Sequence, residues 1–146
     1  MPDESRPVPA RARIVHVALY VRDLERSSGF YETHFGAEVS PEYRSARTSG
    51  FTSRFVTLPG GGPRLELMHL PYLEAPRAGV GYAHIAVSVG ERADVDATVD
   101  RLAAAGVSVA SAARWTGDGY YEAVVLDPDG NPIEITTSDV PVTGKR

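Results

Sequence analysis

The sequence predicts an α+β fold made of two consecutive modules, each with the order strand, helix, strand, strand, strand. Apolar residues alternate in four segments of each half, a helical apolar stripe follows the first of these, and similar segments recur in the second half at a constant offset. A length of 146 residues is typical of one domain. We expect one domain over 13–137, containing module 1 (13–70) and module 2 (81–137), with an N-terminal arm (1–12) and a C-terminal tail (138–146).

In module 1 the first strand is predicted within the alternating segment RIVHVALYV, which begins at Arg13. A helix follows in RDLERSSGFYETHFG, where Leu24, Phe30 and Phe35 belong to one apolar stripe and Gly36 ends it. The remaining strands are expected at Ala37 to Arg44, Ser53 to Leu58 and Arg64 to Leu70. The turn-rich sequence PGGGP joins the last two.

Module 2 repeats this order after a Pro- and Gly-containing connector, PYLEAPRAGVG. Its first strand lies in GYAHIAVSV, and its helix is expected from Glu91 to Ala105, with Gly106 placed to cap its end. The last three strands are expected at Val107 to Ala110, Tyr121 to Leu126 and Pro132 to Thr137.

A constant separation along the chain relates the polar residues of the two modules. The number of residues from His16 to His84 equals the number from Glu66 to Glu134. The same shift places FVTLPGGGPRLEL on AVVLDPDGNPIEI, which makes Val56 equivalent to Val124. Such regularity favours an internal duplication.

The composition excludes several function classes. Fifteen basic and nineteen acidic residues give a net charge of −4, and no long Lys/Arg run is present, so we expect no nucleic-acid partner. No apolar run reaches the roughly 20 residues that span a bilayer, and the N-terminus lacks the apolar core of a secretory signal, so we expect a cytoplasmic protein without membrane contact. Because there are no cysteines, any metal must be held by His, Asp or Glu.

A metal site is the principal functional hypothesis. Strand alternation places His16, Glu66, His84 and Glu134 on the faces opposite the apolar side chains. Buried ionised carboxylates are costly without a partner, and a divalent ion supplies one. Two imidazoles and two carboxylates leave two open positions in an octahedron, as catalysis requires. The alternative is that all four residues are structural. His34 and His69 are not expected to be ligands.

These residues resemble those of the vicinal oxygen chelate superfamily, also called the glyoxalase, bleomycin resistance and dioxygenase proteins. The resemblance lies in HVALYVRDLERSSGFY, GYAHIAVSV and LDPDGNPIEI and covers about Arg13 to Thr137. It implies a curved eight-stranded mixed sheet and one divalent metal per site, with nickel or zinc expected and cobalt, manganese or iron as alternatives. The ligand set is most similar to that of bacterial glyoxalase I.

That resemblance implies a metal-dependent lyase or isomerase acting on the hemithioacetal of a 2-oxoaldehyde, or a similar substrate with vicinal oxygens, through an enediolate. Glu134 is our first choice for the carboxylate that moves the proton and Glu66 the second, because a carboxylate released from the metal has a free lone pair. The residues expected to line the substrate pocket are Tyr20, Met68, Trp115 and Tyr120.

Two departures from the family pattern leave the substrate open. Tyr20 and Leu70 stand where glutathione-dependent relatives commonly place Arg and Asn. Another thiol, a CoA thioester or a non-thiol substrate is therefore an alternative, as are an epimerase, an extradiol-type dioxygenase and a metal-free antibiotic-binding protein. We expect a homodimer, because a sheet of two modules leaves open edges. Whether one chain or two complete the metal site is left open.

Overall fold

The computed structural model describes residues 13–73, 79–117 and 119–138. The expected arm (1–12), most of the expected tail and the middle of the connector (74–78) lie outside the described residues. In the described part the predicted order of elements is found in both modules, with one additional strand.

Module 1 contains β1 (His16–Tyr20), α1 (Leu24–Phe35), β2 (Glu38–Val39), β3 (Tyr43–Arg44), β4 (Thr52–Thr57) and β5 (Arg64–His69). The strand expected from Ala37 to Arg44 is divided into β2 and β3, each of which pairs separately with β4. Pro41 lies between them and has no N–H to donate to the neighbouring strand.

Module 2 contains β6 (Ile85–Gly90), α2 (Arg92–Ala104), β7 (Val109–Trp115), β8 (Tyr121–Leu126) and β9 (Pro132–Thr137). The strand β7 continues well beyond the predicted end at Ala110. Its pairing with β8 shifts register between Val109 and Ser111 and again between Ser111 and Arg114. These irregularities disturb the alternation from which the strand end was predicted.

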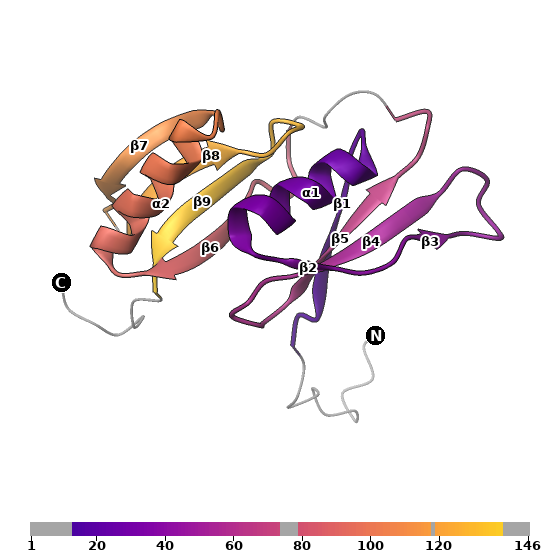
Figure 1. The fold of residues 1–146 in the computed structure, drawn as a ribbon, viewed down its shortest axis with the longest axis horizontal. Helices are drawn as coiled ribbons and strands as arrows, with labels where there is room; N and C mark the ends of the chain where they lie inside the picture. Colours follow the sequence, from indigo (N-terminus) through magenta and orange to yellow (C-terminus); the bar gives the residue numbers. More distant parts are fainter. Residues whose placement is uncertain (1–12, 74–78, 118, 139–146) are drawn as a thin grey trace, which may run out of the picture.

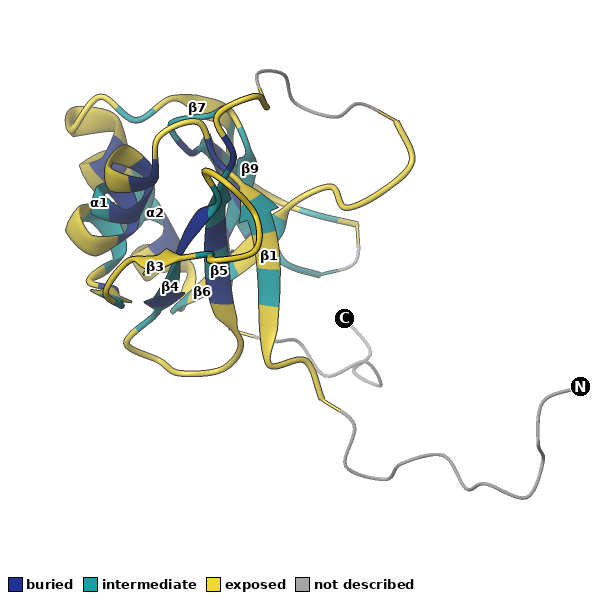
Figure 2. Cartoon of the chain, turned by 90° about the vertical axis from the view of Figure 1, so that its right-hand side faces the viewer, coloured by how far each residue is buried: buried dark blue, intermediate teal, exposed yellow. Residues whose placement is uncertain are grey.

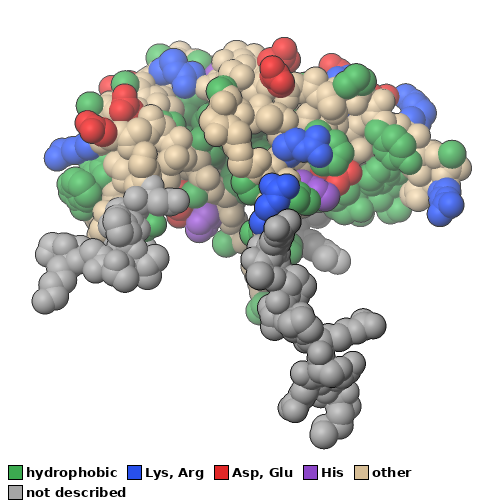
Figure 3. Space-filling model, turned by 90° about the horizontal axis from the view of Figure 1, so that it is seen from below, with side chains coloured by type: hydrophobic (Ala, Val, Ile, Leu, Met, Phe, Trp, Pro, Cys, Tyr) green, Lys and Arg blue, Asp and Glu red, His purple; other side chains and the backbone are tan. Residues whose placement is uncertain are grey.

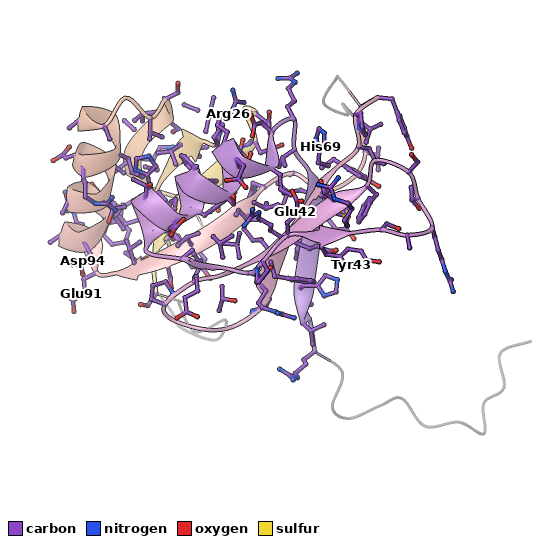
Figure 4. The ribbon with its side chains drawn as sticks, turned by 45° about the vertical axis from the view of Figure 1, so that its right-hand side comes forward. Arg26, Glu42, Tyr43, His69, Glu91 and Asp94 are labelled. Carbon is purple, nitrogen blue, oxygen red and sulfur yellow. The ribbon has the colours of Figure 1, made fainter. Side chains whose placement is uncertain are left out.

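Local sequence explains how the helices begin and end. Asp23 caps α1 by accepting from the N–H of Arg26, and Gly36 ends the helix with φ at 64°, as predicted. At α2, the side chain of Asp94 accepts from the N–H of Glu91 in a capping box (Figure 4). Gly90 precedes it with φ at 127°, and a Cβ there would lie 2.5 Å from a carboxylate oxygen of Asp94.

The strands form two sheets with the same internal order. One contains β1-β5-β4-β2, with β3 paired to β4, and the other contains β6-β9-β8-β7 (Figure 1). The predicted single eight-stranded sheet is therefore not continuous within the described chain, where no ladder joins β1 to β6. Both of these strands are outer strands of their sheets.

The helices cover one side of the strands and leave the other side free of helices (Figure 2). Helix-facing residues of both modules belong to one apolar cluster, in which Leu67, Val95, Leu102, Ile133 and Ile135 are completely buried. Burying this surface is the main favourable contribution to folding. The two modules thus share one core although their sheets are separate.

The turn between β8 and β9 also links the modules. The carboxylate of Asp129, which is only 8% exposed, accepts from the N–H of Arg22 at 3.1 Å and from Nη2 of Arg26 at 3.3 Å. Arg26 additionally donates to the carbonyl of Pro128. Asp127 shapes the turn by accepting from the N–H groups of Asp129 and Asn131.

We expect Asp129→Asn to lower the free energy of unfolding by about 1–2 kcal/mol, because a charge-assisted contact between the modules is weakened. Chemical denaturation of the variant and the wild type measures this. Asp100→Asn is the matched control, since Asp100 is exposed on α2. Equal effects of the two substitutions would show that Asp129 does not hold the modules together.

Candidate functional site

The parallel pairing of the first and last strand of each module brings a histidine and a glutamate together. In module 1, β1 pairs with β5 so that Ala18 lies opposite Glu66, two residues beyond His16. In module 2, β6 pairs with β9 so that Ala86 lies opposite Glu134, two residues beyond His84. The constant separation found in the sequence is thus reproduced in the strand register.

Each module therefore contains one His/Glu pair. Nε2 of His16 lies 3.6 Å from Oε2 of Glu66, and Nε2 of His84 lies 3.1 Å from Oε1 of Glu134. Their side-chain exposures nearly coincide, at 41% and 19% in module 1 and 42% and 20% in module 2. The histidines are accessible while the carboxylates are mostly covered, an arrangement suited to receiving a cation from solvent.

The two pairs do not combine within one chain. Over the ranges 13–73, 79–117 and 119–138, no three His, Cys, Asp or Glu side chains are grouped closely enough to hold a metal ion. Figure 3 shows histidine at separate places on the underside of the molecule. We call the His16/Glu66 pair and the His84/Glu134 pair the two half-sites.

The half-site of module 1 includes aromatic and cationic neighbours that the sequence analysis missed. Phe55 lies opposite Glu66 in the β4–β5 ladder, and its ring packs edge-on against His16 at 5.6 Å. The guanidinium of Arg64 lies over the Phe55 ring, 4.2 Å from its centroid. These contacts restrict the orientation of the His16 imidazole.

The sequence repeat did not point to Phe55, because the strands of the two hairpins pair in different registers. Val124 lies opposite Glu134, whereas Val56 lies opposite Leu65 and is buried in the core. The predicted equivalence of Val56 and Val124 is therefore wrong in structural terms. The turn between β4 and β5 is one residue longer than that between β8 and β9, and a shift of one residue exchanges the faces of a strand.

Two of the four predicted pocket residues lie beside the first half-site. Tyr20 and Met68 are paired across β1 and β5, on the face that carries Glu66. Tyr20 is 49% exposed, so its phenol is accessible to a ligand. Leu70, the second position at which the sequence analysis noted a departure from the family pattern, is buried.

The other two predicted pocket residues, Trp115 and Tyr120, lie away from the half-sites. Trp115 is paired with Tyr121, whose phenol donates to Asp96 of α2 and whose ring lies under the guanidinium of Arg92. This hydrogen bond to Asp96 is the main cause that raises the pKa of Tyr121. Trp115 therefore lies on the helix side of its sheet, opposite the face of Glu134. Tyr120 is half-buried in the turn before β8.

The remaining histidines lie outside both half-sites. Nδ1 of His69 is 3.1 Å from the carbonyl of Val21, at the end of β5 (Figure 4). The His34 ring packs against Phe30 at 5.0 Å near the end of α1. Neither lies in a group of three potential ligands in the described part of the chain.

Comparison with known proteins agrees with this architecture. Residues 13–135 match the family model of the Glyoxalase/Bleomycin resistance protein/Dioxygenase superfamily. The chain belongs to this superfamily. It is 32% identical over 130 residues to the lactoylglutathione lyase of Haemophilus influenzae, covering 84% of this chain and 90% of the relative.

Two further proteins are similar to parts of this chain. The mitochondrial methylmalonyl-CoA epimerase of Mus musculus is 36% identical over 94 residues, covering 59% of this chain and 51% of the epimerase. The solved structure of the trypanothione-dependent glyoxalase I of Leishmania major superposes with a TM-score of 0.69 at 26% identity, covering 86% of each chain. Among the described residues no helix is long and apolar enough to cross a membrane.

The position of Trp115 gives a direct spectroscopic test, because it is the only tryptophan of the protein. Since its ring centroid lies 5.3 Å from that of Tyr121, we expect Tyr121→Ala to increase its solvent contact and shift its fluorescence emission to longer wavelength. Glu134→Ala, on the opposite face, should leave the emission unchanged. The reverse pattern would place Trp115 at the half-site.

Proposed function

We propose that this protein is a metal-dependent lyase or isomerase of glyoxalase I type, acting on the hemithioacetal of a 2-oxoaldehyde. The observation that carries the proposal is the pair of half-sites, which have the same residues, the same strand register and matching exposure. The similarity to lactoylglutathione lyases over most of the chain supports the same activity.

The donor set fits a divalent cation. Two imidazole nitrogens and two carboxylates balance the charge of a dication and leave coordination positions open. We propose that His16, Glu66, His84 and Glu134 hold this ion, with nickel or zinc first among the candidates. When bound, such an ion supplies Lewis-acid stabilisation of negative charge on adjacent substrate oxygens.

We further propose that each complete site forms across a homodimer, with one half-site from each chain. The separation of the half-sites within the described part of a chain supports this arrangement. The positions of the outer strands support it too. His16 begins β1, and His84 directly precedes β6. Large apolar side chains next to these strands are strongly exposed: Ile14 at 68%, Val15 at 52%, Val80 at 111% and Tyr82 at 99%. Pairing with a second copy covers both open edges and apolar surface.

Proton transfer is the task that we assign to the chain's own carboxylates. Glu134 is proposed to accept the proton from the carbon that bears sulfur and hydroxyl and to return it to the neighbouring carbonyl carbon. With the hydroxyl proton passing from the first oxygen to the second, the hemithioacetal becomes a thioester of a 2-hydroxy acid. Its exposure of 20% keeps the carboxylate within reach of substrate while limiting its contact with water. Glu66 is the second candidate for this role.

We propose that the thiol cofactor is a compound other than glutathione, bound by different contacts. Tyr20 offers a phenol and Leu70 a buried apolar side chain, so neither position supplies a cation or an amide for a peptide carboxylate. The similarity to a glyoxalase I named as trypanothione-dependent supports a thiol cofactor other than glutathione.

The second candidate function is epimerisation of an acyl-CoA thioester. The 36% identity to a methylmalonyl-CoA epimerase favours it, although the match covers only 59% of this chain. The same carboxylates would then remove and return a proton at a single carbon. The two functions differ in whether the proton moves between adjacent carbons.

We expect about one divalent ion per chain in purified protein loaded with nickel or zinc, measured by plasma mass spectrometry. His16→Ala, His84→Ala and Glu134→Ala should each abolish binding. His69→Gln is the matched control and should retain the ion, because His69 contacts a backbone carbonyl outside the half-sites. Retention of metal by the three alanine variants would contradict the proposed ligand set.

We expect Glu134→Gln to lower kcat for thioester formation by roughly 10²–10⁴-fold, since the amide cannot accept the proton. The assay uses methylglyoxal hemithioacetals of glutathione, trypanothione and coenzyme A, with metal content verified for each variant. Parallel incubation of a branched acyl-CoA in D₂O detects exchange at the α-carbon. Exchange without thioester formation from any hemithioacetal would favour the epimerase over the lyase.

A further inference from the structure

A cavity separate from the half-sites lies between the two modules. Its volume is about 770 Å³, and its walls come from the end of α1, the turn between β4 and β5, β6 and the second half of α2. None of the four proposed ligands lines it. The volume is within the range of pockets that bind small organic molecules, roughly 300–1,000 Å³.

The polar groups of this cavity have a consistent electrostatic character. Arg101 supplies a permanent positive charge, and Thr33, Ser88 and Thr98 supply hydroxyl groups. No Asp or Glu is found among the described residues that line it, in a chain whose net charge is −4. A cavity with these groups favours an anion over a cation.

Arg101, an exposed residue of α2, contacts the opposite module. Its Nη2 donates to the carbonyl of His34 at 2.9 Å, across the boundary between α2 and α1. This contact uses one of the five N–H donors of the guanidinium. An arginine with further donors is suited to a carboxylate, sulfonate or phosphate group.

The rest of the wall is apolar. Phe35, Leu58 and Pro63 contribute from module 1, and Val87 and Val89 from module 2. Inorganic anions would leave this surface in contact with water, whereas an organic anion would cover it. Burial of apolar ligand surface adds to affinity.

We propose that this inter-module cavity binds a small organic anion, with its acidic group at Arg101 and its apolar body against Phe35, Leu58 and Val87. None of the four proposed metal ligands lines the cavity, although its wall includes Ala86, which lies opposite Glu134. Because both modules form the wall, a bound ligand also bridges them and stabilises the folded chain by mass action.

His34 provides a reporter inside the cavity. It lines the wall beside Arg101, with its ring against Phe30. Burial lowers the pKa of His34, and the positive charge of Arg101 lowers it further. An anion at Arg101 offsets this charge and therefore raises the pKa of His34.

The test uses metal-free full-length protein and benzenesulfonate, whose charge is constant over the range in which histidine titrates. Calorimetry measures affinity, and NMR follows the imidazole signals of His34, His16 and His84. We expect saturable binding that shifts the His34 signal and raises its pKa. We expect Arg101→Gln to weaken binding roughly tenfold or more, and Arg101→Lys to retain part of it. Arg92→Gln, which removes the same charge from the other end of α2, is the control and should bind as the wild type does.

Three results would overturn the proposal. The first is equal affinity for benzyl alcohol, a neutral molecule of similar size, which would show that the anion is not recognised. The second is equal weakening by Arg92→Gln, which would indicate a general charge effect. The third is a shift of His16 or His84 without His34, which would place the ligand at a half-site. Since the protein is metal-free, failure of the proposed lyase activity does not produce any of these results.

Discussion

The parallel pairing between the first and last strand of each module is the constraint on which the candidate site depends. It places an alanine opposite each glutamate, so that the histidine two residues earlier lies beside the carboxylate. The helices occupy the opposite side of both sheets and leave the His/Glu side accessible (Figure 2). The apolar core holds this arrangement because Leu67 and Ile135, the residues directly after Glu66 and Glu134, are completely buried.

This constraint explains why the half-sites are so similar and yet separate. Strand pairing within a module determines the distance between one histidine and one glutamate. It does not determine how the two modules are positioned relative to each other. Within the chain that position is set by the shared core and by the contacts of Asp129 and Arg101 across the boundary. These contacts bring the helices together and leave the outer strands β1 and β6 unpaired on one edge in the described chain.

Much of the fold was predictable from periodicity, because alternation and helical stripes report directly on which side of an element is buried. The constant separation between the two halves is matched in the structure by equal strand registers for Glu66 and Glu134. Features that depend on turn length or on pairing irregularities were not predictable. Because the turn between β4 and β5 is one residue longer than that between β8 and β9, Phe55 lies opposite Glu66, whereas the repeat would have placed Val56 there. The irregular register of β7 leaves Trp115 on the helix side, which a simple count along the strand does not reveal.

The most direct test of the account is a mixed dimer that carries a different defective half-site in each chain. One chain has His16→Ala and Glu66→Ala, the other has His84→Ala and Glu134→Ala, and metal is measured in each homodimer and in the purified heterodimer. If sites form across the dimer, both homodimers lack metal. The heterodimer binds one ion, because the intact half-site of one chain meets the intact half-site of the other. A heterodimer without metal would contradict the account and place each complete site within a single chain.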